Sequence, residues 1–380
     1  MRVCDVVLDS VWYDPRVRKQ IQGYLSNGVD LYVVGIEDYR YNKGEIDKLG
    51  CNISIVPTRY SKSKVGFMKK LLRIYLSNKD LVKAIKDTNP DIIHANDLNA
   101  LLPAYIASKQ TGAKLIYDSH EIFVENIGIS SNRLLRFFWS RIERFLIKRI
   151  DLLVCVSHAA AGYLSNKYKV NNYMVVTNCC NKSDILKLAS VEKHDGFEII
   201  NHGQFYEGRG YDLMIQAARL SLNSNIRYCL RGFGRMEEEL RSDVDKYGLA
   251  NVKFYSPVKV TELIPSASMS HVGLAITVPF CLNFKLSISN KIFEYAAAGL
   301  PVIMSNIPEH KYLNDKYNFG IILDNCTAEE LHSAVMRLYD NPELYIQLSE
   351  NSLKFSEEVN WDNEFMKLLD YEKSILKCAV

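Results

Sequence analysis

The stretch from Asn290 to Val302, NKIFEYAAAGLPV, restricts most strongly what this chain can fold into. Three consecutive alanines favour a helix with a thin face. Gly299 can adopt the left-handed conformation that ends a helix, and Pro301 prevents its continuation. The apolar run PVIMS that follows is typical of a short buried strand. The sequence therefore predicts a helix over residues 290–298 and a strand directly after it, as in an α/β fold.

The start of this helix has the chemistry of a binding site. We expect the loop from Pro279 to Ser289 to lead into a helix N-terminus, where free backbone N–H groups and the helix dipole attract an anion such as a diphosphate. Lys291 stands in the first turn, where a cation opposes the dipole, so we expect it to serve a bound anion. Glu294, one turn further on, can accept hydrogen bonds from vicinal hydroxyls such as those of a ribose. The sequence thus predicts an anion site beside a diol site.

The run N-K-I-F-E-Y-x-A-A-G-L-P-V-I resembles the nucleotide-sugar signature of the retaining glycosyltransferases of family 4, which have the GT-B fold. The resemblance implies that Glu294 holds the ribose of the donor. In that family a second acidic residue usually stands eight positions earlier, against the donor sugar. This chain has Leu286 at that position, so the departure affects the sugar side of the donor site and not the nucleotide side.

A glycine-rich segment, GQFYEGRG over residues 203–210, follows a predicted strand and is the next part of the expected donor site. Glycines let the backbone approach a phosphate, and Arg209 offers a planar fork for one. The resemblance gives Arg209 the diphosphate, whereas Gln204 replaces the arginine that the family has after the first glycine. The remaining donor-side residues expected by resemblance or by position are Gly203, Gly232, Phe233, Gly234, Val258, Ser289 and Asn290.

The first half of the chain opens with a strand-like run over residues 2–9, a helix ending near residue 27 and a second strand over 31–36. No G-x-G-x-x-G motif follows the first strand, which disfavours a dinucleotide-binding oxidoreductase. The loop contains a D-P-R-V segment that resembles the family at this place. Asp14 and Pro15 fit a helix N-cap followed by proline, and we expect Arg16 to face the ligand cleft.

Two further strands of the first half end in polar residues, Asp97 after one and Asp118-Ser119-His120-Glu121 after the other. Ligands of open α/β sheets bind at such strand ends. From the residues alone, His120 could equally hydrogen-bond a neighbouring loop. The D-x-H-E pattern resembles the family and favours function, with His120 near the donor sugar or its phosphate. Lys291, Arg209, Glu294 and His120 are the expected catalytic residues, and Asp14, Arg16, Asp97 and Glu121 the expected acceptor side.

Composition sets further bounds. The chain has 380 residues, enough for two domains, which we place at 1–185 and 186–360, with a last helix over about 360–380 packing back on the first. Nine cysteines without CxxC pairs suggest reduced thiols in a cytosol. The beginning of the chain reads as a first strand rather than a signal peptide, and no apolar run is long enough to span a membrane. We expect no bound metal and no permanent cofactor.

Charge is divided unevenly along the chain. Residues 1–190 hold 28 Lys and Arg against 18 Asp and Glu, whereas the whole chain holds 47 against 44. Residues 59–90 and 132–150 both read as basic amphipathic helices. They could be ordinary surface helices packed on the sheet, or they could dock on anionic lipid. Nucleic acid is disfavoured because no recognised binding motif accompanies the charge.

The sequence, with its resemblance, predicts an α/β protein of the GT-B fold, with two Rossmann-like doubly wound domains facing across a cleft. The implied reaction moves a sugar, with retention, from a UDP- or GDP-sugar to a glycan acceptor. We expect the acceptor to be lipid-linked, in bacterial surface polysaccharide synthesis (O-antigen, capsule or exopolysaccharide) at the inner face of the cytoplasmic membrane. The alternatives are a nucleotide-sugar 2-epimerase of the same fold and a catalytically weak, nucleotide-binding scaffold of a glycan-assembly complex.

Overall fold

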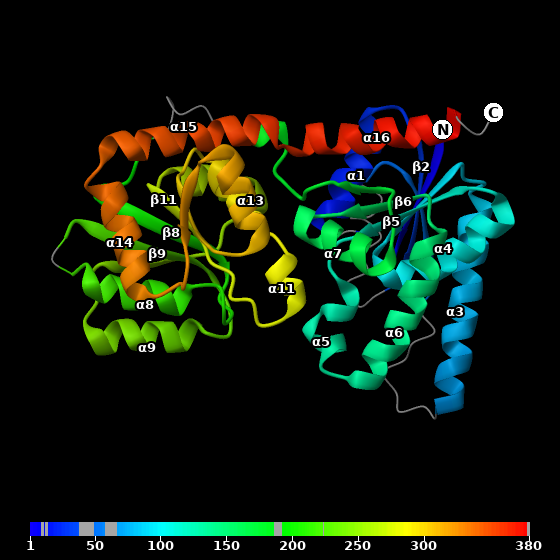
Figure 1. The fold of residues 1–380 in the computed structure, drawn as a ribbon, viewed down its shortest axis with the longest axis horizontal. Coiled ribbons are helices and arrows are strands. Elements are labelled where there is room, and N and C mark those ends of the chain that lie inside the picture. The colour runs from blue at the N-terminus through cyan, green and yellow to red at the C-terminus, as the bar shows by residue number, and fades with distance from the viewer. Residues whose placement is uncertain are drawn as a thin grey trace. The chain divides into compact units, whose positions relative to one another are not determined.

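The computed structural model describes residues 1–8, 11, 14–37, 49–57, 67–185, 192–222 and 224–377, without the side chains of residues 67–76 (Figure 1). The chain forms two compact units. The first consists of Met1–Thr177 and Glu364–Val380, and the second of Asn178–Asn363. The boundary predicted between residues 185 and 186 borders residues 186–191, which lie outside the described residues.

The first unit is built on a seven-stranded sheet in which every neighbouring pair of strands is parallel, in the order β3-β2-β1-β4-β5-β6-β7. Its strands are β1 (Arg2–Val7), β2 (Asp30–Ile36), β3 (Asn52–Val56), β4 (Ile92–Asn96), β5 (Lys114–Ser119), β6 (Leu152–Cys155) and β7 (Tyr173–Val175). Its helices are α1 (Pro15–Ser26), α3 (Phe67–Asp87), α4 (Asp97–Thr111), α5 (Ile127–Ser130), α6 (Arg133–Leu146) and α7 (His158–Tyr168), with 3-10 turns at Phe123–Glu125 and Ile147–Arg149.

The second unit has a six-stranded parallel sheet in the order β10-β9-β8-β11-β12-β13. Its strands are β8 (Phe197–Gln204), β9 (Ile226–Phe233), β10 (Val252–Tyr255), β11 (Val272–Ala275), β12 (Val302–Ser305) and β13 (Gly320–Leu323). Its helices are α8 (Tyr211–Leu220), α9 (Glu237–Tyr247), α10 (Leu263–Ser268), α11 (Leu282–Leu286), α12 (Asn290–Ala297), α13 (Pro308–Tyr317), α14 (Ala328–Tyr339) and α15 (Pro342–Glu358), with 3-10 turns at Lys182–Asp184 and Val260–Glu262. The last helix, α16 (Trp361–Lys377), runs from this unit into the first.

Both sheets have the doubly wound topology that the sequence predicts, and that prediction is confirmed. The strand order reverses between β1 and β4 in the first sheet and between β8 and β11 in the second. Ligands of such sheets bind outside the carboxyl ends of the strands at the reversal. The strands are apolar and buried because helices cover the sheets (Figure 1), as all-parallel sheets require.

The helix N-cap predicted at Asp14 is confirmed, and a second helix of the first unit is capped by a side chain as well. Asp14 caps α1 through its side chain, which accepts hydrogen bonds from the backbone N–H groups of Arg16 and Val17, and Pro15 is the first helical residue. Ser157 caps α7 in the same way. Helix α15 ends at Glu358 and α16 begins at Trp361, close to the start of about 360 predicted for the last helix.

One local prediction needs correction, and another lies partly outside the described residues. The loop predicted from Pro279 to Ser289 contains the short helix α11, which places Phe284 beside Arg209. The basic helix predicted over residues 59–90 is described only as α3 from Phe67, because residues 58–66 lie outside the described residues.

Candidate functional site

In the second unit, the end of β8 lies against the start of α12, and this contact fixes the position of the Lys291 side chain. The Nζ of Lys291 donates a hydrogen bond of 2.6 Å to the Oδ1 of Asn201 and lies 5.0 Å from the centre of the Tyr211 ring. Burial, with repulsion from Arg209 added, lowers the pKa of Lys291 to about 7. The hydrogen-bond partner of this ammonium is a neutral amide, so an incoming anion would meet charge that the amide does not neutralise.

Glu294 lies one turn further along α12 and pairs with His202, the next residue of β8. The Nε2 of His202 donates to the Oε2 of Glu294 over 2.6 Å. The ring of His202 is buried and lies 4.5 Å from the ring of Tyr295, whose hydroxyl accepts the backbone N–H of His202. The hydrogen bond from His202 orients the carboxylate of Glu294, and the Glu294 side chain remains 24% exposed to solvent.

Arg209 is the second cation of this region. Its guanidinium lies 5.3 Å from the centre of the Phe284 ring, and its backbone carbonyl accepts a hydrogen bond from the side chain of Asn201. Burial lowers the pKa of Arg209 from its ordinary value. The nearby N-termini of α12 and α8 begin at Ser289 and Gly210 without a side-chain cap. Their backbone N–H groups are therefore available to an anion.

Two of the predicted glycines, Gly232 and Gly234, stand where a side chain would not fit. A Cβ at Gly232 would lie 1.8 Å from the backbone oxygen of Gly203, and its φ is +146°. A Cβ at Gly234 would lie 2.6 Å from the backbone of Phe205. The ends of β8 and β9 thus approach each other closely, as the glycines permit.

The other predicted donor-side residues lie around these strand ends with different exposure. Gln204 is exposed at the end of β8, and Phe233 is 55% exposed at the end of β9. Val258 and Leu286 are half-buried, Ser289 is buried, and Asn290 is exposed at the first position of α12. Their contacts with a ligand remain predictions.

In the first unit, His120 lies among three carboxylates, one each from the start of α1, the start of α4 and the end of β5. Its Nδ1 lies 3.5 Å from the Oδ2 of Asp14 and 3.7 Å from the Oδ2 of Asp97. Its Nε2 lies 3.7 Å from the Oδ2 of Asp118 and 3.0 Å from the Oδ1 of Asn96. Asp97 also accepts the backbone N–H of His120 over 3.0 Å. The structure thus brings together His120, Asp14 and Asp97.

These neighbours decide the charge of His120. Burial alone would lower its pKa, but the carboxylates of Asp97 and Asp118 outweigh burial and raise it well above its usual value. Burial raises the pKa of Asp97 to about 6. For Asp14 the hydrogen bond and charge of His120 outweigh burial and lower the pKa. His120 is therefore an imidazolium at neutral pH, able to donate to an anionic or hydroxyl oxygen.

Arg16 does not lie where the sequence predicts. It is 2% exposed, and its Nε and Nη2 donate to the two carboxylate oxygens of Asp118, each over 3.0 Å. Its Nη1 donates to the backbone oxygen of Val176 over 2.8 Å. A guanidinium held in this bidentate pair faces the interior, so the expectation that it faces a ligand is wrong. Arg16 instead positions Asp118 beneath His120.

Glu121 is turned toward Asn126, whose side-chain amide donates to its Oε1 over 2.7 Å. Asp97 has a positive φ of 64°, an uncommon conformation for a residue with a side chain. The sequence reasoning missed four partners of this cluster, Asn96, Asp118, His94 and Gln20. Asp118 was visible in the D-x-H-E pattern, but its burial and its pairing with Arg16 were not.

Comparison with known proteins gives the family of the chain. The model of Glycosyltransferase Family 4 matches residues 17–183, and that of Glycosyl transferases group 1 matches residues 183–355. The chain is a GT-B glycosyltransferase. An uncharacterized glycosyltransferase of Haemophilus influenzae is 23% identical over 331 residues, which cover 83% of this chain and 84% of the relative.

Solved structures share the fold of the glycosyltransferase. One from Rickettsia africae superimposes with a TM-score of 0.76 at 16% identity, covering 99% of this chain and 98% of that one. HepE from Anabaena, solved in complex with UDP, gives a TM-score of 0.75 at 14% identity, covering 98% of this chain and all of that one. At these identities the likeness concerns the fold.

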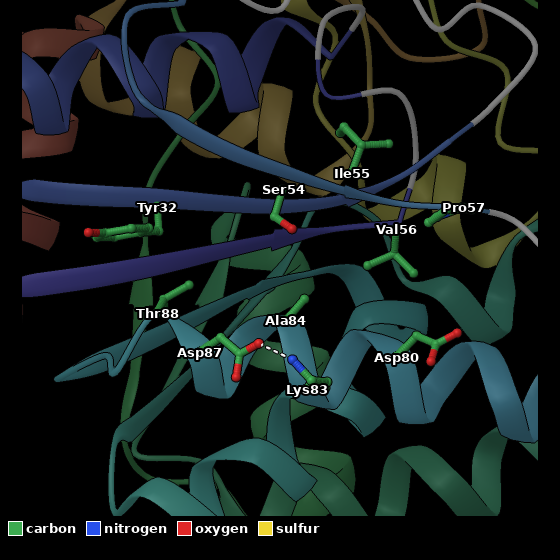
Figure 2. Close-up of a pocket in the computed structure, with 10 residues that line it drawn as sticks. All are labelled: Tyr32, Ser54, Ile55, Val56, Pro57, Asp80, Lys83, Ala84, Asp87 and Thr88. Carbon is green, nitrogen blue, oxygen red and sulfur yellow. Dashed lines mark hydrogen bonds and ion pairs between the residues drawn. The ribbon is translucent and has the colours of Figure 1, made fainter.

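A pocket of the glycosyltransferase lies elsewhere, between α3 and the strands β2 and β3 (Figure 2). Lys83 and Asp87, which line it, pair with each other over 2.5 Å along α3. None of the predicted site residues lines this pocket, and β3 is the edge strand of its sheet. The pocket is thus apart from the strand ends that carry His120.

Two features are absent from the described part of the chain. None of its helices is both long and apolar enough to cross a membrane. None of its groups of three or more His, Cys, Asp or Glu side chains could hold a metal ion.

Proposed function

We propose that this glycosyltransferase moves a sugar from a UDP- or GDP-sugar to a glycan acceptor with retention of the anomeric configuration. The arrangement of Lys291, Arg209 and Glu294 at the start of α12 carries the donor part of the proposal. It combines two partly buried cations with an oriented carboxylate. The two cations fit a diphosphate, and the carboxylate of Glu294 fits the hydroxyls of a ribose. The UDP bound to HepE, a protein of the same fold, is in keeping with a uridine donor.

In this proposal each residue has a distinct task. The leaving diphosphate gains negative charge as the glycosidic bond breaks, and Lys291, Arg209 and the N-terminus of α12 stabilise that charge. Glu294 holds the ribose and fixes the position of the nucleotide. His120 contacts the donor sugar or its phosphate as an imidazolium, while Asp14 and Asp97 accept hydrogen bonds from the acceptor. Glu121 stays on the acceptor side of the proposal, whereas Arg16 acts through Asp118.

The proposed acceptor is a lipid-linked glycan of bacterial surface polysaccharide synthesis, at the inner face of the cytoplasmic membrane. The excess of cations in residues 1–190, 28 against 18 acids, supports an anionic partner for the first unit. A lipid diphosphate and an anionic bilayer would both supply that charge.

Thermal stabilisation by nucleotides tests the donor site. UDP, GDP, ADP and CDP are compared on wild type, Glu294→Ala and the control Glu239→Ala, whose side chain is exposed on α9. One nucleotide at 100 times its dissociation constant should add about 2.7 kcal/mol to the free energy of unfolding. Wild type and the control should show this shift, and Glu294→Ala should lose it. The absence of any shift in wild type would contradict the proposed donor site.

Turnover separates the proposal from its alternatives. The nucleotide-sugar that binds is incubated with a lipid-linked acceptor. The new glycosidic linkage should have the same anomeric configuration as the donor, which is read from the anomeric coupling in the NMR spectrum of the product. Inversion would contradict retention. Free nucleotide-sugar epimerised at carbon 2 would identify an epimerase, and nucleotide binding without any turnover a scaffold.

A further inference from the structure

Helix α6 carries apolar side chains on two faces. Toward the protein, Leu146 is buried and Trp139 packs on Phe123 with ring centres 5.0 Å apart. Four other large apolar side chains are at least half exposed, namely Leu134 at 82%, Phe137 at 64%, Phe138 at 56% and Phe145 at 50%, and of these Phe145 also contacts Tyr105 of α4 with ring centres 6.0 Å apart. Their spacing places all four on one side of the helix. The contacts with the rest of the unit come mainly from the inner face of α6. An exposed apolar stripe on the other side commonly marks an interaction surface.

Cations surround this stripe, which we call the outer face of α6: Leu134, Phe137, Phe138 and Phe145. The guanidinium of Arg141 lies 5.6 Å from the centre of the Phe137 ring, and that of Arg149 lies 3.7 Å from the centre of the Phe145 ring. The other cations from residue 126 to 150 are Arg133, Arg144, Lys148 and Arg136, of which Arg136 pairs with the buried Glu125. The one acid in that range, Glu143, is buried and accepts a hydrogen bond from Tyr168.

We propose that the outer face of α6 docks on an anionic lipid bilayer. Aromatic and leucine side chains on one side of a helix, bordered by arginines, suit the boundary between acyl chains and headgroups. The arginines would lie at the level of the lipid phosphates, which they can bind by paired hydrogen bonds. This inference deepens the proposed membrane location, because it names the helix and the residues that make the contact.

A second copy of this chain fits the same face poorly. A two-fold interface brings identical patches together, so arginines of one copy would face those of the other with no acid available between residues 126 and 150 except the buried Glu143. Like charges brought together in this way repel. An anionic bilayer has the opposite charge and an apolar interior, so it satisfies both features of the face.

Vesicle sedimentation tests the proposal. The full chain is mixed with vesicles of phosphatidylcholine alone or with about a third phosphatidylglycerol. The variants are Phe137→Ser/Phe138→Ser and Arg141→Gln/Arg144→Gln. The matched control is Val260→Ser/Ile346→Ser, which removes apolar side chains that are 79% and 55% exposed in the second unit.

Wild type and the control should bind the anionic vesicles and leave the neutral ones largely unbound. The phenylalanine variant should bind on the order of tenfold more weakly, and the arginine variant should lose roughly fivefold per cation, with the loss shrinking as salt is added. Equal binding by wild type and the phenylalanine variant would overturn the proposal. So would a concentration-dependent dimer, measured by light scattering, that only this variant abolishes.

Nucleotide binding keeps the two proposals apart. The variants of α6 lie in the first unit, outside the cluster around Lys291, so each should keep the nucleotide-induced shift in melting temperature of wild type. A variant that keeps this shift but leaves the vesicles is folded and has lost only the docking face. If wild type binds vesicles but no nucleotide shifts its melting temperature, the proposed function is contradicted and the docking inference is not.

A different observation at the end of β8 carries a second inference. Two consecutive residues of this strand each hold one charged residue of α12: Asn201 accepts from Lys291, and His202 donates to Glu294. Asn201 also donates to the backbone oxygen of Arg209 over 3.0 Å. We infer that Asn201 and His202 are positioning residues of the donor site, Asn201 for the phosphate groups and His202 for the ribose. This inference rests on the proposed function.

Ligand fragments test the division of labour. His202→Phe keeps a ring beside Tyr295 but removes the donor to Glu294, whereas His202→Gln can restore it. By calorimetry, His202→Phe should weaken UDP and uridine equally, by about tenfold for one charged hydrogen bond, and leave pyrophosphate unchanged, while His202→Gln restores the affinity. Asn201→Leu should weaken pyrophosphate and leave uridine nearly unchanged. Equal affinity of wild type and His202→Phe for UDP would overturn the inference, whereas wild type that binds no nucleotide would overturn the proposed function.

Discussion

Nucleotide binding should take up a proton at Lys291, and its affinity should therefore fall as the pH rises above 7. Burial and the neighbouring Arg209 lower the pKa of Lys291 from 10.5 to about 7 in the protein without ligand. A diphosphate next to Nζ favours the charged form and raises this pKa again. The bound complex thus holds a proton that the free protein loses above pH 7.

The size of the effect follows from linkage. Each unit of pKa difference is worth about 1.36 kcal/mol, so the dissociation constant rises up to about tenfold per pH unit above 7, or about 100-fold by pH 9. The stability of the ligand-free protein changes in the opposite sense. A lysine with a lowered pKa binds fewer protons folded than unfolded, so this contribution to the free energy of unfolding rises between pH 7 and 10.5.

Isothermal titration of UDP, or of whichever nucleotide binds, measures the dissociation constant from pH 7 to 9, and buffers of different ionisation enthalpy report the proton taken up. Lys291→Arg is the matched control, because a guanidinium stays charged over this range. Its affinity should be flat while that of wild type falls. The reasoning is refuted if wild type is flat, or if Lys291→Arg shows the same slope as wild type.

Three further changes concern the fold around the two clusters. Gly232→Ala should cost at least about 3 kcal/mol in urea unfolding, since its Cβ would meet the backbone of Gly203; Gly162→Ala, in α7 with open space at its Cβ, should be neutral or slightly stabilising and serves as its control. Asp118→Asn should cost about 3–5 kcal/mol, because it leaves the buried guanidinium of Arg16 without its counter-charge, and a loss below about 1 kcal/mol would mean that the pair is not buried in solution. Burial disfavours the charged form of His94, but Asp118 and Glu372 outweigh it and raise its pKa to about 9; the stability it contributes should be complete below pH 6.5 and lost as the pH rises through 9, and Glu372→Gln should reduce this pH dependence of the free energy of unfolding.

The sequence predicted the parts of the site that depend on local pattern. The helix at Asn290 and its end at Gly299 follow from neighbouring residues, so Lys291 and Glu294 could be placed on one short helix. The glycines of the β8 and β9 ends could be recognised for the same reason. Strand ends at Asp97 and Asp118 were predicted from apolar runs that stop at acidic residues.

Partners distant in the sequence could not be predicted in this way. Asn201 and Lys291 are 90 positions apart, and His202 and Glu294 are 92 apart. Their pairing depends on how β8 and α12 pack, which no local window contains. Arg16 illustrates the same limit. A D-P-R-V segment does not show whether its arginine is exposed or buried, because burial depends on Asp118, the partner of Arg16, which lies 102 positions away.

The two clusters differ in charge, and the difference matches what each would bind. Around α12, the cations Lys291 and Arg209 have a neutral amide and an aromatic ring as their nearest described partners, so the second unit is short of negative charge there. Around His120, the imidazolium faces Asp14 and Asp97, while Asp118 is already paired with Arg16, so two carboxylates of the first unit are left as acceptors. A diphosphate would supply the negative charge that the cluster around α12 lacks. The hydroxyls of a glycan would supply the hydrogen-bond donors that the cluster around His120 lacks. The proposed division of donor and acceptor between the two units is therefore in keeping with the charge and hydrogen bonding within each unit.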